Sequence, residues 1–142
     1  MQEFQLQVDI ESHGGICPKR NSDEAAGYDL YTPEDVILKS RQLTKVPLDI
    51  QTAFTPGWVG LILDRSGLGV KGISRHAGVI DSDYRGNWIV ALYNHSDSDI
   101  EIKRGERVAQ VVFVPIGIAE PEIVEQLPQT IRGSGGFGST GK

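Results

Sequence analysis

Val108-Ala109-Gln110-Val111-Val112-Phe113-Val114 is apolar at all positions but one, whereas a strand with one wet face alternates apolar and polar side chains. Trp88-Ile89-Val90-Ala91-Leu92-Tyr93 has the same continuous apolar character. Strands of this kind need cover on both faces. No long amphipathic helix is evident in the sequence to provide it. We therefore expect the cover to come from a second sheet of the same chain, or from another copy of the chain in a symmetric oligomer.

Short strands are predicted on both sides of these two stretches, each bounded by Gly, Pro, Asn, Asp or Ser. Residues 66–71 predict one or two helical turns, with Ser66 near the N-cap position. The predicted strands are residues 4–10, 36–38, 44–52, 58–63, 88–94, 100–102 and 107–115. This pattern is typical of an all-β sandwich, jelly roll or barrel. A chain of 142 residues fits one domain.

The composition argues against several classes of protein. Apolar residues make up 39% and charged residues 23% of the chain, which is typical of a globular protein rather than a disordered one. A net charge of −5 disfavours a surface that follows a nucleic-acid backbone, because such a surface must be cationic. The single Cys17 cannot form an internal disulfide, and the histidines lack the spacing of zinc ligands.

No signal peptide or membrane span is recognised, because the longest apolar stretch, from Val108 to Ala119, is interrupted by Gln110, Pro115 and Gly117. The sequence therefore predicts a soluble protein with no membrane partner and no nucleic-acid partner. We expect it in the cytoplasm, in the nucleus or, if the source is a virus, in the cytoplasm of the host cell.

The last segment, Arg132-Gly133-Ser134-Gly135-Gly136-Phe137-Gly138-Ser139-Thr140-Gly141-Lys142, differs in composition from the rest of the chain. Glycine frees the backbone to approach a ligand closely and to offer its N–H groups to anions. We therefore predict a compact domain over residues 1–131 and a flexible lid over residues 132–142, which becomes ordered on a phosphorylated ligand. A glycine-rich end without a role is the alternative, and Phe137 and Arg132 argue against it.

Asp64-Arg65-Ser66-Gly67-Leu68-Gly69 follows a predicted strand and opens the predicted helical turn. It places a guanidinium, a hydroxyl and free backbone N–H groups at one helix N-terminus, which suits a phosphate. An ordinary turn is the alternative. The segment is not a nucleophile elbow, because Asp64 occupies the first glycine position of the Gly-x-Ser-x-Gly pattern.

Gly78-Val79-Ile80-Asp81-Ser82-Asp83-Tyr84-Arg85-Gly86 runs from an apolar pair into two acids and an aromatic residue. At the edge of an apolar hairpin, the carboxylate of Asp81 could hold a water and take its proton, and Tyr84 could wall off a sugar ring. A polar loop with solvated acids is the alternative. Asp29 is a weaker candidate for a metal-side acid, and Gln110 lies in an apolar strand where its amide needs a partner.

Five segments, taken together and in order, resemble the five motifs of the trimeric deoxyuridine triphosphate pyrophosphatase (dUTPase) family. The match runs from Ala25 to Gly141 and is highly specific. The segments are Ala26-Gly27-Tyr28-Asp29-Leu30, Arg65-Ser66-Gly67-Leu68, Gly78-Val79-Ile80-Asp81-Ser82-Asp83-Tyr84-Arg85-Gly86, Arg104-Gly105-Glu106-Arg107-Val108-Ala109-Gln110 and Arg132-Gly133-Ser134-Gly135-Gly136-Phe137-Gly138-Ser139-Thr140-Gly141.

The resemblance implies a metal-dependent enzyme that hydrolyses dUTP to dUMP and pyrophosphate by attack of water on the α-phosphorus. This reaction would keep uracil out of DNA and supply dUMP for dTTP synthesis. The resemblance also implies a jelly-roll-like all-β fold and a homotrimer, in which each active site draws motifs from more than one subunit.

The resemblance further implies a role for each motif residue. Asp81 would position and deprotonate the attacking water. Tyr84 would pack under the deoxyribose so that a ribose 2′-hydroxyl does not fit. The backbone around Arg75 to Gly78 would read uracil.

Phosphate, metal and lid roles follow from the same resemblance. Arg65, Ser66 and Gly67 would hold the phosphate chain together with Gln110, and Asp29 would orient Mg²⁺ through its water shell. In the tail, the implied substrate-binding residues would clamp the terminal phosphate, while the aromatic ring stacks on uracil. These tail residues are Arg132, Phe137, Gly138, Ser139 and Thr140.

The chain departs from the family pattern at two places. Asp64 stands where the family usually has proline or another uncharged residue, and an acid there would either weaken triphosphate binding or pair with Arg65. The hairpin that we predict over residues 72–78 is shorter than in many relatives and carries Arg75 and His76 where small or amide residues are common. Base specificity is therefore less well defined by the sequence than phosphate chemistry.

Two rival functions remain to be separated from dUTP hydrolysis. The dCTP deaminases share the fold, but they resemble Arg-Ser-Ser rather than Arg-Ser-Gly at residues 65–67 and lack a tail of this kind. A noncatalytic, regulatory nucleotide-binding protein is the other rival, and the presence of Asp81 argues for catalysis instead.

Overall fold

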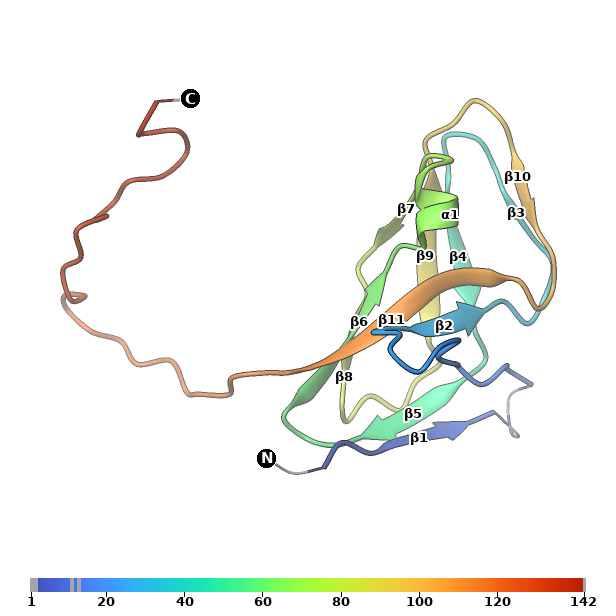
Figure 1. Ribbon diagram of the computed structural model, residues 1–142, viewed down its shortest axis with the longest axis horizontal. Helices are drawn as coiled ribbons and strands as arrows, with labels where there is room; N and C mark the ends of the chain where they lie inside the picture. The colour runs from blue at the N-terminus through green and yellow to red at the C-terminus, as the bar shows by residue number, and fades with distance from the viewer. Residues whose placement is uncertain (1–2, 11, 13, 142) are drawn as a thin grey trace.

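The computed structural model describes residues 3–10, 12 and 14–141, so Lys142 of the predicted lid lies outside the described residues. Short strands and one helical turn make up its regular structure (Figure 1). In chain order these are β1 (Leu6–Asp9), β2 (Tyr28–Tyr31), β3 (Val36–Leu38), β4 (Leu43–Pro47), β5 (Gln51–Phe54), β6 (Trp58–Leu63), α1 (Ser66–Gly69), β7 (Ile73–His76), β8 (Val79–Asp81), β9 (Ile89–Asn94), β10 (Ile100–Ile102) and β11 (Arg107–Pro115). No helix among the described residues has the length and hydropathy needed to cross a membrane.

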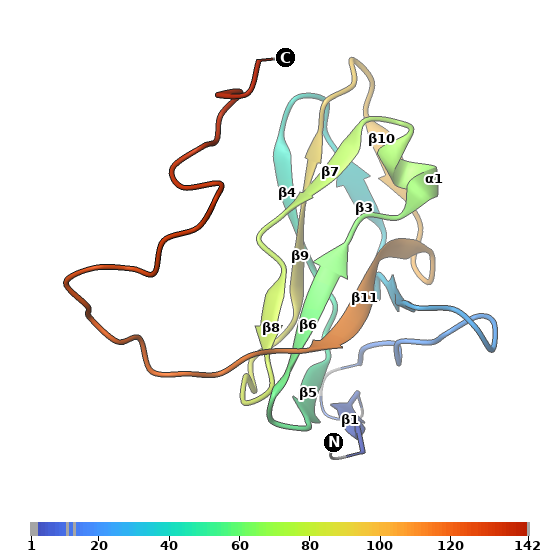
Figure 2. The same ribbon diagram turned by 60° about the vertical axis from the view of Figure 1, so that its left-hand side comes forward.

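The strands form antiparallel sheets, two of them larger than the rest (Figure 2). One has four strands in the order β2-β11-β6-β8, and the other has three in the order β4-β9-β7. The pairs β1-β5 and β10-β3 form two further small sheets. The all-β prediction is confirmed.

One hydrophobic core is shared by the two larger sheets. Trp88 is 1% exposed, and its Nε1 donates to Oγ1 of Thr52 at 3.1 Å, so the one polar atom of this large side chain is satisfied. The four-stranded sheet contributes Leu30, Ile62, Ile80 and Val111, and the three-stranded sheet contributes Val46, Ile73, Val90 and Leu92. The chain is therefore a sandwich in its own right.

This sandwich covers only one face of each continuously apolar strand. In β9, Val90 is buried, whereas its neighbour Ile89 on the opposite face is 47% exposed. In β11, Val111 is buried, while Val112 and Val114 are half-buried. We predict that another copy of the chain covers the opposite faces of these strands.

The prediction of one strand over residues 44–52 is wrong, because the structure divides this stretch between β4 and β5. Asp49 adopts a left-handed backbone with φ of 56°, which turns the chain between the two strands. The N–H of Leu48 donates to the carbonyl of Trp88 at 2.9 Å. After the turn, β5 pairs with β1 instead of β9. The short strand β2 was also missed, because only four residues carry its pattern.

The segment before Asp81 is not the hairpin that the sequence predicts. β7 pairs with β9 in the three-stranded sheet, and β8 pairs with β6 in the four-stranded sheet. The chain crosses between the sheets at Ala77 and Gly78, whose φ angles are 57° and 103°. The N–H of Ile62 donates to the carbonyl of Gly78 at 2.8 Å, and a Cβ at Gly78 would lie 3.1 Å from Ile62. Close packing and a positive φ therefore both favour glycine at this crossing.

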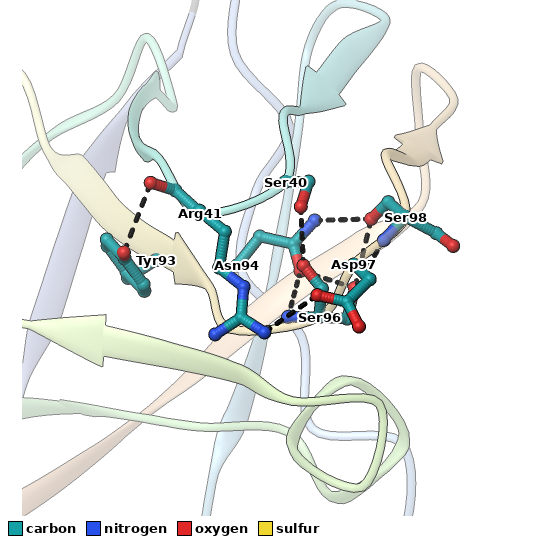
Figure 3. Close-up of polar contacts among 7 residues, drawn as sticks. All are labelled: Ser40, Arg41, Tyr93, Asn94, Ser96, Asp97 and Ser98. Carbon is teal, nitrogen blue, oxygen red and sulfur yellow. Dashed lines mark hydrogen bonds and ion pairs between the residues drawn. The ribbon is translucent and has the colours of Figure 1, made fainter.

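Asn94, at the end of β9, holds two turns at one end of the sandwich together (Figure 3). The residue is fully buried, and its Nδ2 donates to the carbonyls of Leu38 and Ser98, each at 2.8 Å. Its Oδ1 accepts from the N–H of Ser96 at 2.9 Å. A buried amide with all of these partners fixes the geometry of the turns around it.

After Pro115 the chain leaves the sheets and runs outward (Figures 1 and 2). The N–H of Ile116 still donates to the carbonyl of Gly57 at 2.9 Å, and residues 116–134 are exposed. The predicted lid, beginning at Arg132, occupies the far part of this longer segment. The stretch 116–131, which the sequence placed in the compact domain, lies outside the sandwich.

Candidate active site

The predicted phosphate and metal residues meet where three neighbouring strands of the four-stranded sheet come together. Gln110 in β11 lies opposite Asp29 in β2 on one side and opposite Leu63 in β6 on the other. Arg65 follows β6 after one intervening residue. Antiparallel pairing thus places residues 29, 65 and 110 next to one another, although they are far apart in sequence.

Asp29 carries two arginine partners. Its Oδ2 lies 3.4 Å from Nη1 of Arg107, and its Oδ1 lies 3.9 Å from Nε of Arg65. Asn21 also donates from its Nδ2 to the same carboxylate. With two guanidinium groups on one carboxylate, this group of charges keeps an excess of one positive charge, which favours an anionic ligand.

The side-chain amide of Gln110 lies in an apolar strand and needs a hydrogen-bond partner, which the structure provides. Its Nε2 donates to the carbonyl of Asp64 at 2.9 Å. Its Oε1 lies so near Gly27 that a Cβ there would come within 2.4 Å of it. Gly27 is therefore required to be glycine for the side chain of Gln110 to keep this position.

The segment after β6 forms the single turn α1, as the sequence predicts, with one difference at its start. Arg65, not Ser66, is the N-cap residue, and no side chain in the described part of the chain caps the turn. The first N–H groups of a helical turn have no intrahelical acceptor, so those of Ser66 and Gly67 are available to a ligand. Both residues are exposed.

A cleft of about 560 Å³ opens beside these residues. Its size is in the range of pockets that hold small molecules. Its lining comes from β2, α1 and the β10–β11 region, and consists of Tyr31, Arg65, Gly67, Leu68, Lys71, Ile100, Glu101, Ile102, Gly105, Glu106 and Arg107. The cleft is therefore continuous with the arginine pair on Asp29.

Asp81 and Tyr84 form a second group, at the other end of β6. Asp81 is exposed and lies opposite Val59, four residues before Leu63 along β6. At a rise of about 3.3 Å per residue, those positions are separated by roughly 13 Å along the strand. Asp81 therefore does not lie beside the Arg65 group of its own chain.

Tyr84 is held by its own turn. Its N–H donates to the carbonyl of Asp81 at 3.1 Å, and its hydroxyl donates to the carbonyl of Asn87 at 3.0 Å. The ring lies over Gly86, where a Cβ would come within 2.3 Å of the hydroxyl oxygen. Gly86 leaves the space that lets Tyr84 lie flat on its turn.

The tail residues form a third group. Nε of Arg132 donates to the carbonyl of Gly135 at 2.8 Å, and the N–H of Ser139 donates to the carbonyl of Gly136 at 3.0 Å. Phe137 is fully exposed at a φ of 50°. The tail curves around a cavity of about 510 Å³, which is lined by Ile131, Arg132, Gly135, Gly136, Phe137, Gly138, Ser139 and Thr140. Within one chain these residues lie away from both other groups (Figure 1).

Comparison with known proteins shows that all three groups of residues lie within a region that matches one protein family. The family model for dUTPase matches residues 14–141. A deoxyuridine 5′-triphosphate nucleotidohydrolase of Candida glabrata is 48% identical over 139 residues, which cover 96% of each chain. A protein of the same name from Oryza sativa is 44% identical over 96% of this chain and 80% of its own.

The chain belongs to the dUTPase family. Among solved structures, a mutant dUTPase of Staphylococcus bacteriophage 80alpha with dUpNHpp matches with a TM-score of 0.89 at 30% identity, covering 97% of this chain and 99% of the phage chain. A mutant dUTPase of phage phi11, described with a structural Mg(II) ion, matches with a TM-score of 0.78 at 29% identity, over 86% and 97% of the two chains. The predicted dUTPase fold is thereby confirmed.

Some residues of this candidate site were missed by sequence reasoning. Arg107 lies in a motif segment but received no role, and its contact with Asp29 depends on the pairing of β11 with β2. Asn21 and Tyr31 were also missed; Nδ2 of Asn21 lies 3.3 Å from the hydroxyl of Tyr31. Asn21 lies eight positions before Asp29, and nothing in the sequence indicates that the two side chains are in contact.

Proposed function

We propose that this member of the dUTPase family hydrolyses dUTP to dUMP and pyrophosphate, with Asp81 as the general base. The observation that carries the proposal is the family match over residues 14–141, which contains all five motif segments. The curated relatives carry the name deoxyuridine 5′-triphosphate nucleotidohydrolase. The physiological role is to keep uracil out of DNA and to provide dUMP for dTTP synthesis, in the cytoplasm or the nucleus.

The triphosphate binds at the start of α1. Arg65 supplies a charged donor, and the N–H groups of Ser66 and Gly67 are directed at the anion. Gln110 contributes from β11, where its amide is already fixed by the carbonyl of Asp64. Support for this placement is the pair of arginines on Asp29 and the adjoining cleft.

The nucleoside binds at the second group of residues. The backbone around Arg75 to Gly78, where the chain crosses between the two sheets, reads the edge of uracil. Tyr84 packs under the deoxyribose. The hydrogen bond from its hydroxyl to the carbonyl of Asn87 holds the ring on its turn, so a 2′-hydroxyl would clash with it.

Asp81 holds the water and accepts its proton as the oxygen forms a bond to the α-phosphorus. The bond from the α-phosphorus to the bridging oxygen then breaks, and pyrophosphate leaves. The side chain is exposed at the end of β8 and is therefore accessible to a water and a substrate.

The residues fit a Mg²⁺ ion that is held mainly by the substrate. Among the described residues, no cluster of three or more His, Cys, Asp or Glu side chains could enclose a metal ion. Mg²⁺ commonly uses one or two carboxylates, substrate phosphates and several waters instead of an all-protein cage. Asp29 would orient the ion through water, and when bound the ion supplies charge neutralisation to the triphosphate.

The tail from Arg132 onward closes over the bound nucleotide. Phe137 stacks on the base, and Arg132, Ser139 and Thr140 hold the terminal phosphate, with Gly138 allowing the backbone to come close. The exposure of Phe137 supports this role, because a fully exposed aromatic ring gains by burial on a ligand. Closure excludes bulk water from the reaction.

The active form is a homotrimer in which one site draws on more than one chain. Asp81 and the Arg65 group lie too far apart along β6 to form one compact site within a chain. The incompletely covered faces of β9 and β11 supply the apolar surface that subunits bury against each other.

One assay tests the proposed function directly. Release of pyrophosphate and of ammonia is measured with dUTP, dCTP, dTTP and UTP side by side, in the presence of Mg²⁺. We expect rapid pyrophosphate release from dUTP alone and no ammonia from any substrate. Ammonia from dCTP would identify a deaminase, and binding of dUTP without product release would identify a noncatalytic regulator.

A further inference from the structure

The unusual acid at position 64 has a specific backbone partner. Oδ1 of Asp64 accepts a hydrogen bond from the N–H of Arg75 at 2.8 Å. Among the described residues it forms no ion pair with Arg65, whose guanidinium lies beside Asp29 instead. Asp64 therefore ties the end of β6 to β7, and of the two roles considered for it from sequence, pairing with Arg65 is not found.

Arg75 extends this connection to the crossing between the sheets. Its Nη1 donates to the carbonyl of Ala77 at 2.9 Å. Ala77 has a φ of 57°, a left-handed conformation that is unfavourable for a residue with a Cβ. The guanidinium thus secures a backbone geometry that alanine would not adopt by itself. Gly78, which follows, is secured from the other side by Ile62.

The main chain of Asp64 completes the link to the phosphate end of the site. Its carbonyl accepts from Nε2 of Gln110 at 2.9 Å, while its carboxylate holds Arg75. One residue thereby joins a phosphate-binding side chain to the backbone segment that lies along the base. Both departures from the usual family pattern, at position 64 and in the short segment 72–78, belong to the same set of contacts.

We propose that Asp64 and Arg75 are positioning residues that set the base specificity of this enzyme, by holding the backbone at Ala77 and Gly78 in the geometry that accepts uracil. The proposal rests on the proposed function, because it requires that this backbone reads the base. Asp64 and Arg75 do not position the general base. Asp81 is positioned separately, by the pairing of β8 with β6, so turnover of bound dUTP does not depend on Asp64.

Three variants and a matched control test the assignment. Asp64→Ala removes the acceptor for Arg75, Asp64→Asn keeps an oxygen acceptor without the charge, and Arg75→Ala removes the bond to Ala77. Asp99→Ala is the control, because Oδ1 of Asp99 accepts a backbone N–H from Ser40 at the same 2.8 Å, in a turn outside the site. Each variant is assayed for pyrophosphate release from dUTP and dCTP, with melting temperature and subunit assembly measured in parallel.

We expect Asp64→Ala and Arg75→Ala to raise KM for dUTP and to lower the preference for dUTP over dCTP, each by about five- to tenfold, with kcat for dUTP within about twofold. Asp64→Asn should retain the preference of the unaltered enzyme, since it restores an acceptor. Asp99→Ala should change neither KM nor preference. A purely structural role would instead lower stability and affect dUTP and dCTP alike.

Unchanged base preference in both Asp64→Ala and Arg75→Ala, with the unaltered enzyme active on dUTP, would overturn the positioning role and leave the proposed function intact. A preference in Asp64→Asn as poor as in Asp64→Ala would also overturn it, because the charge and not the hydrogen bond would then matter. If Asp64→Ala does not fold, Arg75→Ala alone decides. Failure of the unaltered enzyme to hydrolyse dUTP would reject the proposed function itself.

Discussion

Asp81 and Asp83 are two residues apart and both exposed, yet only Asp81 is expected to act chemically. Asp81 lies in β8 and is fixed by its pairing with Val59 in β6, whereas Asp83 follows in the turn. A general base must be held in position as well as ionised. The two acids therefore differ in how their backbone is held: strand pairing fixes Asp81, whereas Asp83 lies in a turn.

The first prediction follows from this difference. Asp81→Asn should bind dUpNHpp within about twofold of the unaltered enzyme and lose at least about a hundredfold in kcat, because an amide cannot take a proton from water. Asp83→Asn is the matched control and should hydrolyse dUTP normally. Calorimetric titration and pyrophosphate release measure the two quantities. Normal turnover by Asp81→Asn would remove Asp81 from the mechanism.

The second prediction concerns the sugar. Gly86→Ala places a Cβ where the ring of Tyr84 now lies, so the ring must move and its bond to Asn87 must break. We expect the preference for dUTP over UTP to fall by roughly tenfold, because a displaced ring leaves room for a 2′-hydroxyl.

Gly117→Ala is the control for this substitution, since no atom of the described residues lies within 4 Å of a Cβ at that position. Relative kcat/KM for dUTP and UTP gives the measurement. A preference that is unchanged in Gly86→Ala would show that Tyr84 does not exclude the ribose.

At the scale of elements, the tail and the sandwich are separate in the structure. Residues 116–134 are exposed, and the hydrogen bonds of the described lid residues are local, such as that of Arg132 with Gly135. A chain that ends at Ile131 should therefore fold and assemble like the full chain, and lose about a hundredfold or more in kcat/KM for dUTP.

Circular dichroism, size-exclusion chromatography and pyrophosphate release test this third prediction. Phe137→Ala in the full chain serves as a finer variant that removes base stacking while leaving the phosphate contacts. The lid assignment would be wrong if the shortened protein hydrolysed dUTP at the normal rate.

Strands with a simple apolar pattern could be predicted from the sequence, and strands defined by their partners could not. Residues 58–63 and 107–115 were found with their bounds, because their apolar runs end at turn-forming residues. The break at Asp49 and the crossing at Ala77 depend on left-handed backbones of residues other than glycine. Such conformations leave no mark in an apolar pattern, because surrounding packing imposes them.

The candidate site shows the same limit. Motif resemblance identified Arg65, Gln110 and Asp29, and strand register brings these three together. The role of Asp64 was left open between two electrostatic effects, whereas the structure gives it a backbone partner in Arg75. A hydrogen bond between segments eleven residues apart depends on the fold and not on local sequence.

At the scale of the whole molecule, one chain does not present a complete site. The base-and-sugar group, the phosphate group and the lid lie at different places on it, and apolar side chains remain exposed around the sandwich. Leu43 is 52%, Ile89 47% and Val79 66% exposed. An assembly that buries such side chains and brings Asp81 of one copy to Arg65 of another satisfies both requirements.

Mixed assembly of two inactive variants tests this central claim most directly. Asp81→Asn and Arg65→Ala chains should each be inactive alone. They are unfolded and refolded together in equal amounts before pyrophosphate release from dUTP is measured. If each site takes Asp81 from one chain and Arg65 from another, random assembly restores both residues in about one quarter of the sites. We therefore predict about one quarter of the activity of the unaltered enzyme, and no recovery in the mixture would contradict the shared site.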